Sequence, residues 1–333
     1  MKSPRKIMVI GANCFSGQDF IDLLLDDPGN EVIGVSRSAE RSDLFLSYKL
    51  RADLSRYRYF RIDYNHDMHK LLALIDHVTP AYIVNFAALS EVAPSWENPG
   101  DWLQTNCVGL AHLANHLRKQ VWLERYLHIS SPEVYGTCVG DVRESAPLNP
   151  STPYAVSKAA ADMLLAAYHR QYGLPVVTVR ATNVYGARQQ LHKIIPRTFI
   201  YAKLGRTIEL HGGGAAIKSY IHIRDVSQGE LAILERGNAG SIYHLSPDSG
   251  ISVHGLVRTI CQKLGVQFEK ATRMVDERPG QDAAYLINSG RARNELGWQP
   301  TVSLGSGLAE TQEWIDTYWD FISQAPLEYK HQP

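Results

Sequence analysis

Short apolar runs that suit buried parallel strands alternate with helical patterns through the first half of this chain. The first helical pattern begins near Ser16 and continues through Leu25. The apolar runs occupy residues 6–10, 31–35, 57–62, 81–85, 126–129 and 174–179. This alternation predicts an α/β fold built on a Rossmann sheet, doubly wound and parallel, with right-handed crossovers.

The regular alternation loosens after about Asn183. Helical patterns near residues 226–234, 253–264 and 304–318 alternate there with short strands, and turns or breakers fall at residues 212–214, 247–250 and 279–280. We therefore expect a smaller mixed α/β lobe over the carboxyl edge of the sheet. The predicted domains are residues 1–182 with a returning segment at about 216–245 for the Rossmann domain, and residues 183–215 and 246–333 for the C-terminal lobe.

The charge balance excludes several classes of partner. Basic and acidic side chains number 34 each, so no overall field favours nucleic acid or an anionic membrane. No apolar run approaches the roughly 18 residues of a membrane span, and the first residues lead into a strand rather than a signal peptide. The cysteines Cys14, Cys107, Cys138 and Cys261 form no C-x-x-C pair. We expect a cytoplasmic protein with neither a metal site nor disulfides.

A glycine-rich turn separates the first predicted strand from the first predicted helix. A dinucleotide diphosphate binds at such a point, against the N-terminus of the helix. The spacing fits G-x-x-G-x-x-G with Cys14 at the middle position, and an ordinary strand-to-helix turn is the alternative. The residues assigned to a dinucleotide cofactor here are Gly11, Asn13, Cys14, Phe15, Ser16 and Gly17.

The residues after the second strand indicate which nicotinamide cofactor is bound. A carboxylate there would bind the ribose hydroxyls of NAD, but the sequence is Ser36-Arg37-Ser38. A guanidinium flanked by hydroxyls suits the 2′-phosphate of NADP, so NADP is favoured and NAD is the alternative. Asp63, with Tyr64 beside it, is assigned to the adenine side, although an aspartate there also suits a turn.

Tyr154 and Lys158 are four residues apart in a predicted helix and therefore lie on one face of it. An ammonium beside a phenol stabilises the phenolate and would let it act as a base near neutral pH. Ser131 and Glu133 precede this pair in a predicted loop after a strand, and Pro132 lies between them. Two bases of different strength indicate more than a simple alcohol oxidation.

Taken together, these segments resemble the extended short-chain dehydrogenase/reductases that modify nucleotide sugars. The resemblance covers nearly the entire chain, at residues 11–17, 85–90, 105–109, 130–136, 154–158, 183–186 and 278–280. Within this group the chain is most similar to the nucleotide-hexose 4,6-dehydratases. Residues 85–88 and 36–38 favour the NADP-dependent GDP-mannose type, whereas residues 191–196 and 278–280 favour the dTDP-glucose type.

The resemblance implies a role for each matching position. Tyr154 would take the proton of the sugar C4 hydroxyl, Lys158 would lower the Tyr154 pKa and hold the nicotinamide ribose, and Ser131 would bind the same hydroxyl. Asn106 would support a water relay. Further cofactor contacts would come from Ala87, Ala88 and Thr105, with Tyr154 and Lys158. The implied substrate contacts are Ser90, Ser131, Pro132, Glu133, Asn183, Lys193, Lys218 and Arg278, the cations and Asn183 serving the diphosphate.

The implied reaction is the dehydration of a nucleotide diphosphate sugar through a 4-keto intermediate. Oxidation at C4 acidifies the C5 proton, which Glu133 would remove while water leaves from C6. The dTDP-glucose enzymes carry an aspartate acid where this chain has Pro132, and the GDP-mannose enzymes also lack that aspartate. An epimerase without water loss is the first alternative, and a non-catalytic binding protein is the second. The resemblance also implies a homodimer through helices around residues 103–117 and 154–168.

Overall fold

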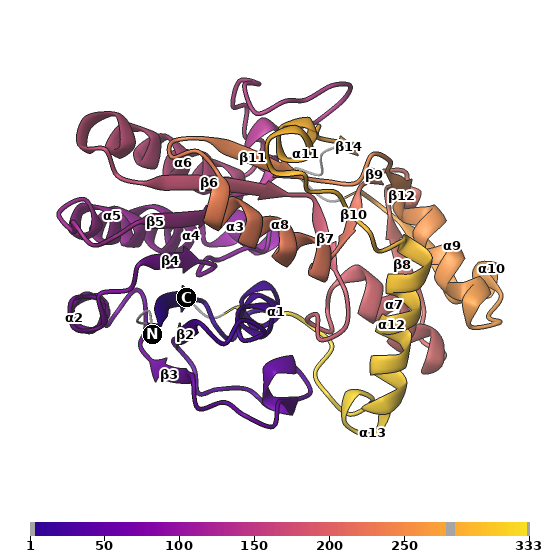
Figure 1. The fold of residues 1–333 in the computed structure, drawn as a ribbon. Helices are drawn as coiled ribbons and strands as arrows, with labels where there is room; N and C mark the ends of the chain where they lie inside the picture. The colour runs from indigo at the N-terminus through magenta and orange to yellow at the C-terminus, as the bar shows by residue number, and fades with distance from the viewer. Residues whose placement is uncertain (1–3, 278–283, 332–333) are drawn as a thin grey trace.

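The computed structural model describes residues 4–277 and 284–331, and its centre is a seven-stranded parallel sheet (Figure 1). The strand order is β11-β6-β5-β4-β1-β2-β3. The strands are β1 (Arg5–Ile10), β2 (Asn30–Ser36), β3 (Tyr57–Arg61), β4 (Tyr82–Asn85), β5 (Arg125–Ile129), β6 (Val176–Ala181) and β11 (Ile242–Leu245). This sheet confirms the predicted doubly wound fold: the six predicted strands end within two residues of the expected positions, and β11 is a seventh strand for which no range was predicted.

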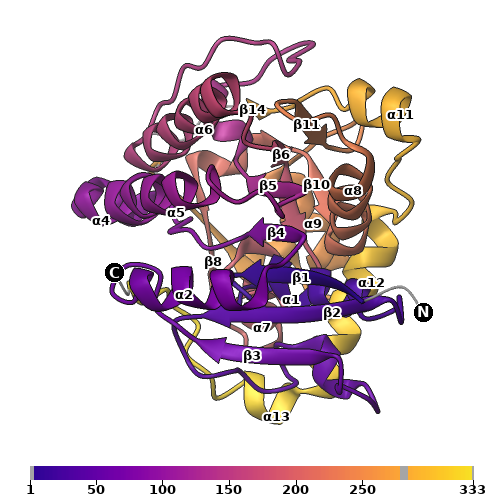
Figure 2. The same cartoon turned by 60° about the vertical axis from the view of Figure 1, so that its left-hand side comes forward.

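Helices cover both faces of the sheet, which explains why its central strands are largely apolar (Figure 2). Side chains along β1 alternate, with Ile7 and Val9 in one core cluster and Met8 and Ile10 in the other. The first cluster includes residues of α1 (Phe15–Leu24), α8 (Ile223–Arg236) and α11 (Gly290–Leu296). The second includes residues of α2 (Met68–Val78), α5 (Leu110–Leu117) and α6 (Pro153–Tyr172).

Short helices join β4 to α5. They are α3 (Ala93–Glu97) and α4 (Pro99–Leu103), followed by one π-helical turn at Gln104–Gly109. Such a turn inserts an extra residue into the helix and often occurs at functional sites. It interrupts the helix that the sequence predicts around residues 103–117, because helical periodicity alone does not reveal a π-helical turn.

A smaller lobe with short strands lies beside the carboxyl ends of the central strands (Figure 1). Its strands pair as β7 with β10, β8 with β13, and β9 with both β12 and β14, the β9–β12 pair being antiparallel. The strands are β7 (Asn183–Tyr185), β8 (Ile208–His211), β9 (Ile217–Lys218), β10 (Tyr220–His222), β12 (Ile251–Ser252), β13 (Thr272–Val275) and β14 (Ala284–Tyr285). The helices are α7 (Ile194–Lys203), α9 (Val253–Lys263), α10 (Phe268–Ala271), α12 (Leu304–Thr317) and α13 (Trp319–Ile322).

The chain crosses between the two parts more than once. After β7 it builds part of the smaller lobe and then returns through α8 to β11, which pairs with β6 at the edge of the main sheet. The predicted domain limits, with a returning segment at about 216–245, remain a prediction. Among the described residues no helix is long and apolar enough to cross a membrane.

Candidate active site

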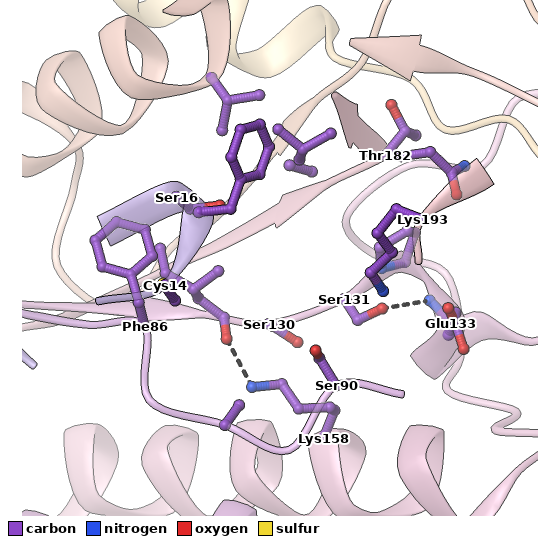
Figure 3. A pocket seen from close by; sticks show the side chains of 18 of the residues that line it. Cys14, Ser16, Phe86, Ser90, Ser130, Ser131, Glu133, Lys158, Thr182 and Lys193 are labelled. Carbon is purple, nitrogen blue, oxygen red and sulfur yellow. Dashed lines mark hydrogen bonds between the residues drawn. The ribbon is translucent and has the colours of Figure 1, made fainter. Parts of the chain in front are cut away.

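A cavity of about 340 Å³ lies where β1, β4, β5 and β6 end, the place where open α/β sheets bind ligands. Figure 3 shows its lining, with Lys158 and Ser90 on one side and Thr182 and Lys193 on the other. The sequence-predicted residues that line it are Cys14, Phe15, Ser16, Ala88, Ser90, Ser131, Pro132, Glu133, Tyr154, Lys158, Asn183 and Lys193. Residues from widely separated segments therefore meet in one site.

The start of α6 places Tyr154 and Lys158 at this cavity. Thr152 caps the helix, its hydroxyl accepting the N–H of Ala155 at 3.1 Å, and Pro153 follows where no backbone donor is needed. The predicted spacing of Tyr154 and Lys158 on one helical face is thus present, and both side chains are buried. Figure 3 shows Lys158 pointing toward the end of β5.

Lys158 is held by the backbone of that strand. Its Nζ donates a hydrogen bond to the carbonyl of Ile129 at 2.7 Å. Burial lowers the pKa of Lys158 to about 8, and the negative charge of Asp162 acts in the opposite direction. The ammonium is therefore close to losing its proton under mildly alkaline conditions.

The pKa of Tyr154 is raised, the reverse of the expectation from sequence. Burial is the main cause, and the charge of Glu133 adds to it, while a hydrogen bond with Ser131 acts the other way. That Lys158 lowers the Tyr154 pKa stays a prediction.

Ser131, Pro132 and Glu133 form the start of a 3₁₀ helix at Pro132–Tyr135. The hydroxyl of Ser131 accepts the N–H of Glu133 at 3.2 Å, which caps the helix (Figure 3). Pro132 occupies the first position, where a missing N–H costs nothing. The proline that disrupts the acid position of the family pattern therefore has a structural role, and Glu133 is half-buried at the cavity wall.

A buried charge network supports the active-site helix from behind. Asp162, one turn after Lys158, accepts hydrogen bonds from Ser130 at 2.7 Å and from Nη2 of Arg180 at 2.7 Å. His128 lies 3.5 Å from the same carboxylate. Burial alone would raise the pKa of Asp162, but its bonds to His128, Arg180 and Ser130 lower it to about 2. Asp162 is therefore ionised at neutral pH and fixes α6 against β5 and β6.

The glycine turn brings α1 close to the sheet. Gly11 has φ +94°, and a Cβ there would lie 2.8 Å from the nitrogen of Ala87. A Cβ on Gly17 would lie 2.4 Å from the carbonyl oxygen of Gly11. Cys14 caps α1, with its Sγ accepting the N–H of Gly17 at 3.2 Å. The predicted strand-to-helix turn is thus present, and Cys14 is accommodated as a cap.

Asn13 is used by the protein itself. Its Nδ2 donates to Ser38 Oγ at 3.0 Å, to the carbonyl of Ala39 at 2.8 Å and to Tyr59 Oη at 2.8 Å, and its backbone N–H donates to Ser36 Oγ at 3.0 Å. These bonds tie the glycine turn to the loop after β2. The side chains of Asn13, Ser36 and Ser38 therefore hold the loop, and none of them lines the described cavity.

Other residues predicted for the cofactor also lie outside the cavity lining. Asp63 accepts the N–H of Asn65 at 2.8 Å and of His66 at 3.1 Å, the turn-forming alternative that the sequence left open. Thr105 Oγ1 accepts a hydrogen bond from Asn65 at 2.9 Å. The predicted cofactor residues that do not line it are Gly11, Asn13, Gly17, Ser36, Arg37, Ser38, Asp63, Tyr64, Ala87 and Thr105.

Asn106 lies in the π-helical turn with its amide fully engaged. Its Oδ1 accepts the N–H of Leu89 at 2.9 Å, and its Nδ2 donates to the carbonyl of Leu89 and to Ser157 Oγ, each at 2.9 Å. Asn106 thereby connects the loop after β4 to α6. This arrangement fixes the Tyr154 helix and leaves the proposed support of a water relay untested.

A second cavity of about 830 Å³ adjoins the first and extends into the smaller lobe. Ser90, Glu133, Asn183 and Lys193 line both. The predicted Lys218 lines the second, with its Nζ 5.0 Å from the centre of the Tyr285 ring. Arg278 lies outside the described residues.

Lys193 has an acidic partner that sequence reasoning missed. Its Nζ lies 2.7 Å from Glu91 Oε1, and His192 Nε2 lies 3.0 Å from the same oxygen. Burial would raise the pKa of Glu91, but Lys193 and His192 lower it to about 2. The position of Glu91 next to Ser90 at the end of β4 is a signal that could have identified it.

The C-terminal segment was also missed. Tyr329 lines the second cavity and packs edge-on against His192, with ring centres 5.5 Å apart. His331 stacks on Trp102 and lies 2.8 Å from Asp101 of α4. A segment so far along the chain therefore closes one side of the cavity, and no motif in it indicates this contact.

A Rossmann sheet with a Tyr–Lys pair at helical spacing beside its strand ends defines a short-chain dehydrogenase/reductase of the extended type. The family profile described as GDP-mannose 4,6-dehydratase matches residues 8–311. The chain belongs to this family, as the resemblance in its sequence predicts.

Relatives within the family share sequence and structure over most of the chain. A dTDP-glucose 4,6-dehydratase from Xanthomonas campestris pv. campestris is 34% identical over 73% of this chain and 75% of its own length. Another from Streptomyces niveus is 33% identical over 93% of this chain and 92% of its own. A dTDP-glucose 4,6-dehydratase structure from Streptomyces venezuelae, with NAD bound, is 32% identical with a TM-score of 0.87, covering 95% of this chain and 98% of that chain.

Proposed function

We propose that this protein is a nucleotide-sugar 4,6-dehydratase that oxidises a hexose at C4 and releases water to give a 4-keto-6-deoxy sugar. The observation that carries the proposal is the convergence of Tyr154, Lys158, Ser131 and Glu133 on one cavity. That cavity adjoins a larger one lined by Lys193 and Lys218, which suits an anionic substrate. The dehydratase relatives support the same reaction class.

The cofactor in this proposal is a nicotinamide dinucleotide. The close approach of Gly11 and Gly17 and the open N-terminus of α1 fit a dinucleotide diphosphate. The nicotinamide supplies the hydride acceptor and donor that the reaction needs.

NADP is the favoured cofactor, and NAD, which the Streptomyces venezuelae structure holds, is the alternative. The end of β2 carries Ser36-Arg37-Ser38 without a carboxylate, and Arg37 is exposed. Arg41 lies near the glycine turn, with its guanidinium 3.7 Å from the centre of the Phe45 ring and its backbone N–H bonded to Asn13. Fixed guanidinium groups at this end of the site favour a 2′-phosphate. Calorimetric affinities for the two cofactors decide between them.

Tyr154 is the base for the C4 hydroxyl, and Ser131 holds that hydroxyl. Because the pKa of Tyr154 is raised, the phenol loses its proton only when positive charge lies nearby. Tyr154 therefore acts as a base only after the cofactor and substrate have bound. Lys158 is the protein's cation at that position and holds the ribose. This sequence of events couples proton removal to substrate and cofactor binding.

Glu133 removes the C5 proton after C4 has become a ketone. Because Pro132 has no proton to give, Glu133 or a water that it orients returns a proton to the departing C6 hydroxyl. The half-buried position of Glu133 at the junction of the two cavities supports this double use. The nucleotide diphosphate is assigned to Asn183, Lys193, Lys218 and Arg278.

Incubation with GDP-mannose, dTDP-glucose and UDP-glucose, followed by mass spectrometry, tests the proposal. A product lighter by one water supports it. A product of unchanged mass and altered stereochemistry indicates an epimerase instead. Tight binding of a nucleotide sugar with no product from any of the three indicates the non-catalytic alternative.

The proposal includes a homodimer and a cytoplasmic location. Large apolar side chains on the helices predicted for the dimer face solvent, with Val156 44% exposed and Met163 65% exposed on α6, and Leu103 and Val108 each 40% exposed. Exposed apolar side chains on neighbouring helices favour an interface. Light scattering should show a dimer that Met163→Glu dissociates, whereas Met274→Glu, at an exposed position on β13, leaves it intact.

A further inference from the structure

Glu230 is a buried carboxyl on α8 that the proposed reaction does not use. It is 1% exposed, and its Oε2 has no hydrogen-bond partner within residues 4–277 and 284–331. The side chain lines the smaller cavity together with Cys14 and Ser16, at the N-terminus of α1. Buried polar atoms almost always have a partner, so an open one that faces a cavity indicates a ligand.

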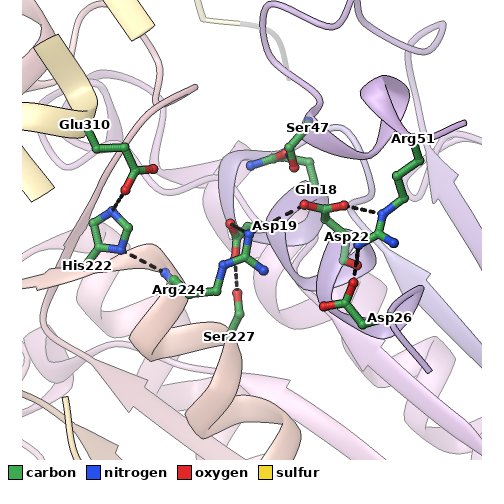
Figure 4. Close-up of polar contacts among 10 residues, drawn as sticks. All are labelled: Gln18, Asp19, Asp22, Asp26, Ser47, Arg51, His222, Arg224, Ser227 and Glu310. Atoms are coloured by element: carbon green, nitrogen blue, oxygen red, sulfur yellow. Dashed lines mark hydrogen bonds and ion pairs between the residues drawn. The ribbon is translucent and has the colours of Figure 1, made fainter. Parts of the chain in front are cut away.

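Among the residues that the structure describes, no cation offsets the charge of this carboxyl. Its charged neighbour is Asp19, which accepts a hydrogen bond from Ser227 at 2.7 Å and lies 3.3 Å from Arg224 (Figure 4). Arg224 lies 3.5 Å from Asp22 as well, so its charge is shared between two aspartates. The Cys14 thiol is the other ionisable group near Glu230, and burial raises its pKa to about 11, so it is neutral.

The remaining charged groups on elements that pack against α8 have partners of their own. His222 lies 3.2 Å from Glu310 (Figure 4). The others are Arg125, His128, Arg180, His244, Arg291, Arg293 and Glu295, which form hydrogen bonds or ion pairs with other residues. Burial and the charge of Asp19 therefore raise the pKa of Glu230 well above its ordinary value. This shift favours the neutral acid, which carries one O–H donor.

A hydrogen-bond donor of this kind would help the N-terminus of α1 to bind a diphosphate. Helix N-termini bind diphosphates through free backbone N–H groups. In this chain Cys14 Sγ accepts the N–H of Gly17, which removes one of those donors. An ionised carboxylate beside a diphosphate would repel it, whereas a neutral acid forms a strong O–H···O⁻ hydrogen bond.

We propose that Glu230 binds the dinucleotide cofactor as a neutral acid, donating a hydrogen bond to the diphosphate at the N-terminus of α1. This inference rests on the proposed function, since it takes a nicotinamide dinucleotide as the ligand. It adds to the cofactor site a residue of α8 far from the glycine motif in sequence.

Equilibrium binding of NADPH and NADH to wild type, Glu230→Gln and Glu230→Leu at pH 7 tests the inference. Gln keeps a donor in the same place, so its affinity should lie within about twofold of wild type. Leu removes the donor, and its dissociation constant should rise about tenfold or more. Glu235→Leu, on the exposed face of the same helix, is the matched control and should bind like wild type.

ADP-ribose, which carries the diphosphate without the nicotinamide, locates the contact. Glu230→Leu should weaken ADP-ribose as much as the complete cofactor. In wild type the affinity should fall as the pH rises through the pKa of Glu230, because ionisation places a negative charge beside the diphosphate. Glu230→Gln should not show that dependence.

The outcomes separate the two claims. If wild type binds and turns over but Glu230→Leu binds as tightly, or if ADP-ribose is unaffected by that change, the inference about Glu230 is wrong and the proposed function stands. If folded wild type binds neither nicotinamide cofactor, both claims are wrong. Circular dichroism of each variant confirms that the fold is intact.

Discussion

The two ends of the predicted ligand site differ in how they use polar side chains. After β1 and β2, Asn13 is bonded to its own loops, so the glycine turn presents mainly backbone and a helix N-terminus. After β5, Tyr154 and Glu133 face a cavity shared with Lys193. The first end therefore offers a ligand mainly backbone groups, whereas the second end carries the side chains proposed to react. Substitutions at the first should therefore affect folding and cofactor binding, and those at the second should affect turnover.

The largest effect is expected for Tyr154→Phe. Removing the phenolic hydroxyl removes the base at C4, so kcat should fall about 10³-fold, within the usual range for a general base. Thermal unfolding and cofactor affinity should stay near wild type, because the ring remains in its packing. Steady-state assays with the true substrate measure the loss. Activity within a few fold of wild type would contradict the role of Tyr154.

Asp162→Asn should affect stability strongly. The change leaves the buried Arg180 without its counter-charge, which typically costs about 3 kcal/mol or more. Because the pKa of Asp162 is depressed to about 2, its stabilising contribution is present above pH 4 and is lost as the pH falls toward 2. Urea unfolding at pH 7 measures the cost. Asp141→Asn, at a surface pair with Arg143, is the control and should change little.

Asn13→Ala and Asn183→Ala compare the two ends directly. Asn13→Ala removes four hydrogen bonds of a buried amide and should lower the free energy of unfolding by about 2 kcal/mol. Asn183, bonded at 3.3 Å to the carbonyl of Ser219, lines both cavities, so its change should mainly raise KM for the nucleotide sugar. If the two changes lowered the free energy of unfolding equally, the proposed difference between the two ends of the site would be contradicted.

The smallest effect is expected for Glu91→Gln. Glu91 neutralises Lys193, so removing its charge frees the ammonium for the substrate diphosphate. KM for the nucleotide sugar should fall about threefold, corresponding to less than 1 kcal/mol, at unchanged kcat. Lys193→Ala should raise KM instead. A rise in KM for both variants would show that Glu91 positions Lys193 rather than masking it.

The sequence predicts the fold and the chemical end of the site well, for a physical reason. Strands buried on both faces must be apolar, and Tyr154 and Lys158 are linked by local helical geometry, so both leave a readable pattern. Pro132 is explained only by the 3₁₀ helix that it begins. The raised pKa of Tyr154 depends on burial and on the charge of Glu133, which sequence spacing does not specify.

Contacts between distant segments are what the sequence could not predict. Glu230 and Tyr329 reach the cavities through the packing of α8 and of the C-terminal segment. Neither residue belongs to a motif. In the sequence Glu230 looks like any exposed helical glutamate, and nothing there indicates that it is buried. Sequence also does not reveal that the side chain of Asn13 bonds to its own loops, and its assignment to the cofactor stays a prediction.

The most direct test of the central claim is the fate of a deuterium label at C4 of the accepted nucleotide hexose. If Tyr154 takes the C4 hydroxyl proton while the C4 hydride passes to the nicotinamide and then returns to C6, the product is lighter by one water, keeps the label, and shows it at C6 by NMR and mass spectrometry. A product that has lost no water, or that carries the label at C4, would contradict the dehydration proposed for this protein.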